Sequence, residues 1–146
     1  MKITDKCNTI EFGIIGYQFP NAGRSKPNDP DYDANWLTVQ VGYTEDETTA
    51  VFQDSCVLTW ELKEMADALS EMLDDRETAY ISEFMEPYLK FAVARAGDNF
   101  TFTIDFVCDV SDGEWKKIKA TQLLDWEQLS AVLDEVKQYL ITYPAR

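Results

Sequence analysis

The residues whose spacing most resembles a chemical site are three aspartates in a proline-containing segment. Asp29, Asp31 and Asp33 alternate in the run NDPDYDANWL, as do positions 1, 3 and 5 of a calcium-binding loop. Such a loop also needs glycine at position 6 and a bidentate glutamate at position 12, where this chain has Ala34 and Gln40. We therefore predict no metal site here. The pattern favours a solvated turn in which Asp and Asn side chains cap backbone amides.

The rest of the chain offers little for catalysis. It contains no histidine, which removes the usual general base near neutral pH and the commonest metal ligand. It also lacks a nucleophile elbow, a phosphate-binding glycine loop and an H-E-x-x-H helix. Two carboxylates in a cleft can hydrolyse a glycoside, but 27 acidic residues leave no pair distinguished. We predict no catalytic residues and no cofactor.

Composition indicates one globular domain spanning residues 1–146. The chain is 45% hydrophobic and 13% aromatic, and it is long enough to bury a core without disulfides or metals. Its three cysteines are widely spaced and form no C-x-x-C pair, which is typical of a reducing compartment. No apolar run has the length of a membrane span or the form of a signal peptide. These features predict a cytoplasmic protein that binds no membrane.

Alternating apolar residues and turn signals predict the strands. Residues 35–43 alternate cleanly, and the polar residues 44–47 separate them from a returning strand, which predicts a hairpin. A second set of strands is separated by the turn Ala96–Gly97–Asp98. The expected strands are 9–20, 35–43, 48–54, 88–94, 99–109 and 114–120.

Two amphipathic helices follow the strands. An apolar stripe with helical spacing begins at Leu58, and Thr59 is the expected N-cap. The last helix has a stronger start signal, because Asp125 and Gln128 have the spacing of a capping box. The expected fold is therefore α+β, with an antiparallel β-sheet of about six strands and two α-helices packed on it.

Charge placement predicts a binding partner. The formal net charge is −14, and no basic residue lies between Lys26 and Lys63. Such a surface repels nucleic acid and attracts cationic protein surfaces. Solubility, or protection of strand edges, is the alternative explanation of the acidity. The candidate partner-binding residues are Asp29, Asp31, Asp33, Glu45, Asp46, Glu47 and Asp54.

Three short runs carry a family resemblance. GYQFP (16–20), YDANWL (32–37) and LTWEL (58–62), in that order, resemble the WapI family of bacterial immunity proteins, which are small cytosolic partners of secreted contact-dependent toxins. The resemblance covers mainly residues 10–75 and implies binding to a cognate toxin domain. It also implies structural roles for several residues: Trp36 and Leu37 anchor a strand, while Asp33 and Asn35 hold the loop. The family-motif residues are Tyr17, Tyr32, Asp33, Asn35, Trp36, Trp60 and Glu61.

Three functional hypotheses follow. The first is an immunity protein that neutralises a toxin domain by occluding a basic active site, with no enzymatic activity of its own. The second is a generic acidic interaction or regulatory module, and the third is a small carboxylate-dependent hydrolase. The sequence does not specify an oligomeric state.

Overall fold

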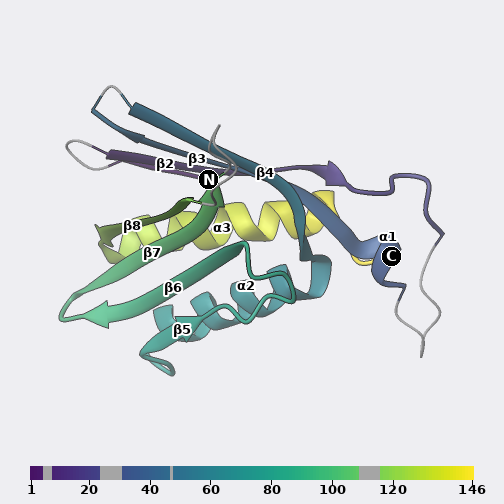
Figure 1. Cartoon of the computed structure of the whole chain (residues 1–146). Coiled ribbons are helices and arrows are strands. Elements are labelled where there is room, and N and C mark those ends of the chain that lie inside the picture. Colours follow the sequence, from purple (N-terminus) through teal and green to yellow (C-terminus); the bar gives the residue numbers. More distant parts are fainter. Residues whose placement is uncertain (5–7, 24–30, 47, 109–115) are drawn as a thin grey trace.

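The computed structural model describes residues 1–4, 8–23, 31–46, 48–108 and 116–146. These residues form two four-stranded antiparallel sheets with two long helices and one single-turn helix (Figure 1). The predicted α+β class is confirmed. The prediction of one sheet of about six strands is wrong in its count, because the described residues form eight strands in two sheets.

Each sheet is built from neighbouring segments of the chain. The first sheet has the order β1-β2-β3-β4 and the second the order β5-β6-β7-β8, with every pair antiparallel. The first comprises β1 (Lys2–Thr4), β2 (Asn8–Tyr17), β3 (Trp36–Glu45) and β4 (Thr48–Leu58). The second comprises β5 (Ala79–Ile81), β6 (Leu89–Ala96), β7 (Asn99–Cys108) and β8 (Lys116–Leu124).

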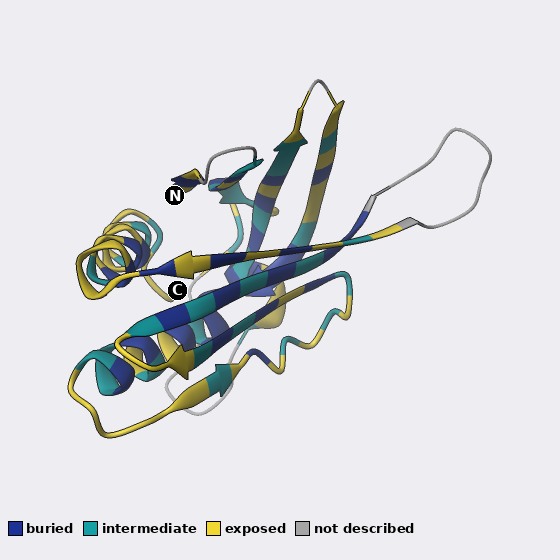
Figure 2. Ribbon diagram, turned by 90° about the vertical axis from the view of Figure 1, so that its left-hand side faces the viewer, coloured by how far each residue is buried: buried dark blue, intermediate teal, exposed yellow. Residues whose placement is uncertain are grey.

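The two sheets share a core without sharing a hydrogen-bonded ladder. Phe12 of β2 meets Phe91 of β6 edge to face at 5.3 Å between ring centroids. Phe52 of β4 lies 6.3 Å from Phe106 of β7. Large aromatic surfaces therefore join the sheets through side chains, and Figure 2 shows the buried residues on the faces that the sheets and helices turn toward one another.

Both predicted hairpin turns are present. Gly97 adopts φ +66° between β6 and β7, a left-handed conformation that glycine enters without steric cost. Asp46, after β3, adopts φ 51°, which aspartate tolerates better than most residues.

The long helices, α2 (Thr59–Leu73) and α3 (Trp126–Thr142), pack against each other and against the sheets (Figure 1). The capping box predicted for α3 is confirmed: the Gln128 N–H donates to Asp125 Oδ1 at 2.8 Å, and the Asp125 N–H donates to Gln128 Oε1 at 2.9 Å. The predicted N-cap Thr59 is wrong by one residue, because Leu58 occupies that position. Thr59 is the first helical residue, and its hydroxyl donates elsewhere. None of the helices in the described ranges is both long and apolar enough to cross a membrane.

Candidate partner-binding surface

The three sequence runs that resemble the immunity family meet at one end of the first sheet. The Gln18 N–H donates to the Trp36 carbonyl at 2.9 Å, and Trp36 pairs with Leu58 in the ladder between β3 and β4. The first and third runs therefore lie on either side of the start of β3. The middle run also supplies the single-turn helix α1 (Tyr32–Asn35) at this end of the molecule (Figure 1).

Asn35 is the hydrogen-bonding centre of this end. Its side chain is 1% exposed, and Nδ2 donates to the main-chain oxygens of Asp31 at 2.8 Å and Arg146 at 3.0 Å. Oδ1 accepts the Thr59 hydroxyl at 2.8 Å and the Arg146 N–H at 2.9 Å. One buried amide thus joins α1, the start of α2 and residue 146, which are far apart in the sequence.

Glu61 performs a similar task at the start of α2. Its carboxyl group is buried and accepts the Leu58 N–H at 2.8 Å and the Met85 N–H at 2.6 Å. The first bond caps the helix, and the second ties the segment between β5 and β6 to it. Leu58 has no side-chain acceptor, so the capping of this helix start comes from the Glu61 side chain.

Arg146 fixes the segment that follows β2. Its guanidinium lies over the Tyr17 ring, with 3.5 Å from Cζ to the ring centroid, and Nη1 donates to the Pro20 carbonyl at 2.9 Å. The Tyr17 hydroxyl donates to the Pro144 carbonyl. These contacts hold the backbone of residues 17–20 against the last residues of the chain.

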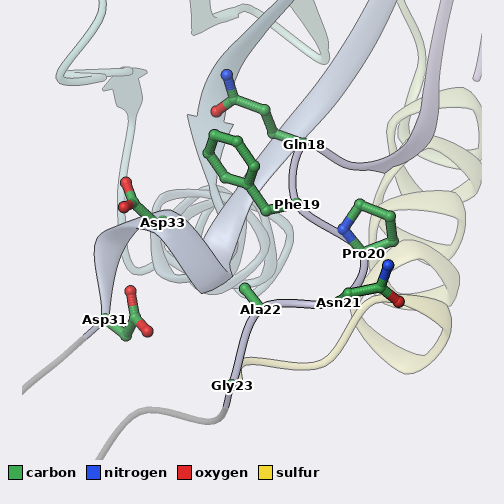
Figure 3. Close-up of a pocket in the computed structure, with 8 residues that line it drawn as sticks. All are labelled: Gln18, Phe19, Pro20, Asn21, Ala22, Gly23, Asp31 and Asp33. Atoms are coloured by element: carbon green, nitrogen blue, oxygen red, sulfur yellow. The ribbon is translucent and has the colours of Figure 1, made fainter.

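The residues held in this way border a surface depression, which we call the α1 depression. Its volume is about 520 Å³. One wall is the segment 18–23 and the other is the α1 region with the Asp31 and Asp33 carboxylates (Figure 3). None of the described residues that line it is basic. The depression is therefore a concave surface with negative charge on one wall.

Exposed aromatic residues accompany these carboxylates. Phe19, which lines the depression, is 46% exposed, and Tyr32 on α1 is 45% exposed. Tyr32 packs edge to face on Trp60 of α2, with 5.2 Å between ring centroids, so its ring is held in place. Rigid, partly exposed aromatic rings beside charged groups are typical of protein–protein contact surfaces.

The two described aspartates of the depression differ in their local roles. Asp31 is the N-cap of α1, and its Oδ1 accepts the Ala34 N–H at 3.2 Å. Asp33 is exposed in the first turn of the same helix. Asp29, the third aspartate of the sequence pattern, lies outside the described residues.

The other predicted acidic residues lie away from the α1 depression. Glu45 and Asp46 are exposed at the far end of β3. A strand of ten residues separates them from α1, a span of about 33 Å. Asp54 is exposed on β4 between these ends, and Glu47 lies outside the described residues. The described members of the acidic run are thus spread along the first sheet and do not form one cluster.

The remaining motif residues are buried or half-buried. Tyr17, Trp36 and Trp60 are half-buried, and Leu37 is completely buried at the start of β3. The sequence reasoning missed the roles of Phe19 and Arg146. The Phe-Pro pair ahead of a polar loop was a usable signal for Phe19, whereas no local pattern connects Arg146 with residues more than 120 positions earlier.

Little in the described residues points to catalysis or metal binding. Across residues 1–4, 8–23, 31–46, 48–108 and 116–146, no group of three or more Cys, His, Asp or Glu side chains is placed to hold a metal ion. Cys56 is fully buried, and burial together with nearby acidic groups raises the pKa of its thiol to about 12. The thiol therefore stays protonated near neutral pH and is a poor nucleophile.

Comparison with known families gives a match that covers nearly the whole chain. The model of the immunity protein WapI-like family matches residues 2–144. The chain belongs to this family. The match extends the resemblance seen in residues 10–75 across both sheets and both long helices of this WapI-like protein. A comparison with curated proteins finds no match.

Proposed function

We propose that this WapI-like protein binds a cognate toxin domain and neutralises it by covering a basic active site, without transforming any substrate. Family membership is the observation that carries this proposal. The net charge of −14 supports it, because an acidic protein attracts a cationic partner and speeds its association. The protein acts in the cytoplasm, where its widely spaced cysteines remain reduced.

We further propose that the α1 depression contacts the toxin. Its acidic wall suits a lysine or arginine side chain. Phe19 and Tyr32 offer apolar contact area beside that charge, so one basic side chain gains both electrostatic and cation–π contacts. Glu45, Asp46 and Asp54 lie farther along the first sheet, where their charges add to the steering of a basic toxin.

The direct test is co-expression with the toxin domain encoded immediately upstream of this gene. The expected result is that cells making the toxin domain grow only when they also make the WapI-like protein. The two proteins are also expected to co-purify at a fixed stoichiometry. Growth arrest despite soluble WapI-like protein, with no complex after purification, rejects the proposal for that toxin.

Charge reversal at the α1 depression tests the contact surface. Replacing exposed Asp33 with lysine is expected to weaken toxin binding about tenfold, since it places a positive charge where a basic toxin side chain docks. Isothermal titration calorimetry on the purified pair measures this change.

Asp98→Lys is the matched control for Asp33→Lys. Asp98 is also exposed, in the turn between β6 and β7, and the substitution changes the net charge by the same amount. We expect Asp98→Lys to change the affinity less than about twofold at physiological salt. Asp98 lies outside the α1 depression, and salt screens the interaction between exposed charges that are more than about 8 Å apart. Equal losses in the two variants would show that net charge alone matters and that the α1 depression is not the contact.

A further inference from the structure

The β3–β4 hairpin leaves one strand edge of the first sheet unpaired. β4 is the last strand in the order β1-β2-β3-β4, and β3 pairs with it on one side. No strand among the described residues pairs with its other side. In Figure 2 the far half of this hairpin stands apart from the helices, and much of it is exposed. Within the described ranges, the outer edge of β4 therefore has no strand that pairs with its backbone N–H and C=O groups.

Residues 48–53 of this edge lack the features that usually protect a strand from pairing with another chain, and the register shift on β4 lies beyond them, between Ser55 and Val57. The stretch TTAVFQ, residues 48–53, contains no charged residue and no proline. Val51 in its centre is 52% exposed, and Thr48, Thr49 and Gln53 are also exposed. Proteins normally place lysine, proline or a bulge at such an edge to prevent unwanted pairing. An unprotected edge of this length is suited to accepting an added strand.

Charge at the two ends of the stretch selects the kind of strand that fits. Glu45 and Asp46 lie at the hairpin turn, and Asp54 lies at the inner end, and all three are exposed. An added strand therefore meets an uncharged centre between two acidic ends. A second copy of this chain, itself carrying −14 charges, is disfavoured by repulsion, whereas a segment with lysine or arginine at its ends is attracted.

We propose that the outer edge of β4, residues 48–54, receives an extended segment of the cognate toxin as a fifth strand of the first sheet. The segment has an apolar or β-branched centre and basic residues at its flanks. The identity of the partner rests on the proposed function, but the mode of binding is additional to it. A toxin of ordinary domain size spans both β4 and the α1 depression, since they lie within about 35 Å on one sheet.

Amide hydrogen exchange measured by NMR, with and without the toxin domain, tests the added strand. Strand addition forms new backbone hydrogen bonds at every second residue of one edge. We expect alternate amides within residues 48–54 to exchange at least about tenfold more slowly in the complex. Unchanged exchange throughout this stretch, in a complex that forms normally, overturns the inference and leaves the proposed function intact.

A lysine at Val51 provides a second readout. Val51→Lys adds a charge that protects a strand edge and repels a basic segment, so we expect the dissociation constant to rise at least about tenfold. Ile15→Lys is the matched control: Ile15 is also 52% exposed and lies on β2 of the same sheet. We expect Ile15→Lys to change the dissociation constant of the complex by less than about twofold. Circular dichroism on both variants verifies that the fold is retained.

The outcomes separate the two proposals. A complex that Val51→Lys weakens and Ile15→Lys does not weaken supports the added strand, and equal effects of the two substitutions overturn it. Failure of the unaltered protein to bind the toxin rejects both the proposed function and the inference. A dimer of the protein alone that Val51→Lys abolishes, measured by sedimentation, assigns the edge to a second copy and also overturns the inference.

Discussion

Replacing Asn35 with alanine is expected to lower the free energy of unfolding by about 3 kcal/mol, the largest effect predicted for any substitution in this chain. The buried amide makes four hydrogen bonds, to Asp31, Thr59 and both main-chain groups of Arg146. Alanine leaves the buried Thr59 hydroxyl and the half-buried main-chain groups of Asp31 and Arg146 without these hydrogen bonds. Chemical denaturation followed by tryptophan fluorescence measures the change.

Asn21→Ala is the control for Asn35→Ala. Asn21 is exposed in the segment after β2, and the same substitution there is expected to cost less than about 0.5 kcal/mol. A loss at Asn35 no larger than the loss at Asn21 would contradict the role of Asn35 as the connection between α1, α2 and residue 146.

Replacing Glu61 with alanine is expected to cost about 2 kcal/mol at neutral pH. The carboxylate accepts the backbone N–H groups of Leu58 and Met85, and alanine leaves both donors without this acceptor. Thermal or denaturant unfolding measures the loss. Glu64→Ala on the exposed face of the same helix is the control and is expected to change stability by less than about 0.5 kcal/mol.

The effect of Glu61 also depends on pH in a direction set by its burial. Burial raises the pKa of Glu61 above its ordinary 4.5; its two backbone hydrogen bonds act in the opposite direction, and the charges of Glu64 and Glu86 add to the rise. The folded state therefore holds the proton more tightly than the unfolded chain, so the contribution of Glu61 is greatest below pH 4.5 and falls as pH rises through the folded pKa.

The resulting expectation concerns the difference between the unaltered protein and Glu61→Ala. That difference in unfolding free energy is expected to be larger near pH 4 than near pH 7. Denaturant titrations of both proteins at several pH values measure it. A difference that grows from pH 4 to pH 7 would show that hydrogen bonding outweighs burial at this carboxyl.

Local signals in the sequence predicted the parts of the fold that local interactions determine. The capping box of Asp125 and Gln128 placed the start of α3 correctly, because both residues act within one helical turn. The same reasoning misplaced the cap of α2. Thr59 has the right side chain for an N-cap, but its hydroxyl bonds to Asn35, 24 residues earlier, and tertiary contact outweighs local preference.

Elements without a local signal could not be predicted. β1 and β5 have three residues each. Three residues are too few for the alternation of apolar and polar residues in a strand to be recognised. The division into two sheets depends on which strands pair, and alternation within a strand gives no information on its neighbours. The prediction of one larger sheet was therefore wrong because the number of sheets depends on which strands pair, and alternation within each strand does not show this.

The candidate surface was predictable only in part. The aspartates and the three family runs are visible in the sequence, but their arrangement is not. Ten residues of β3 place Glu45 far from Asp33, although both belong to one acidic stretch of the chain. Arg146 and Phe19 come together with that surface only through folding. Composition predicted a cationic partner, and only the fold shows the concave surface that we propose as its contact.

The most direct measurement is the association rate constant of the purified protein with its upstream toxin domain as salt increases. Electrostatic steering by the acidic surface predicts that this rate constant falls at least about tenfold between about 20 mM and about 500 mM salt. The dissociation rate is expected to change much less over the same series. An association rate constant that stays the same across the series would contradict recognition of a cationic toxin by this acidic protein.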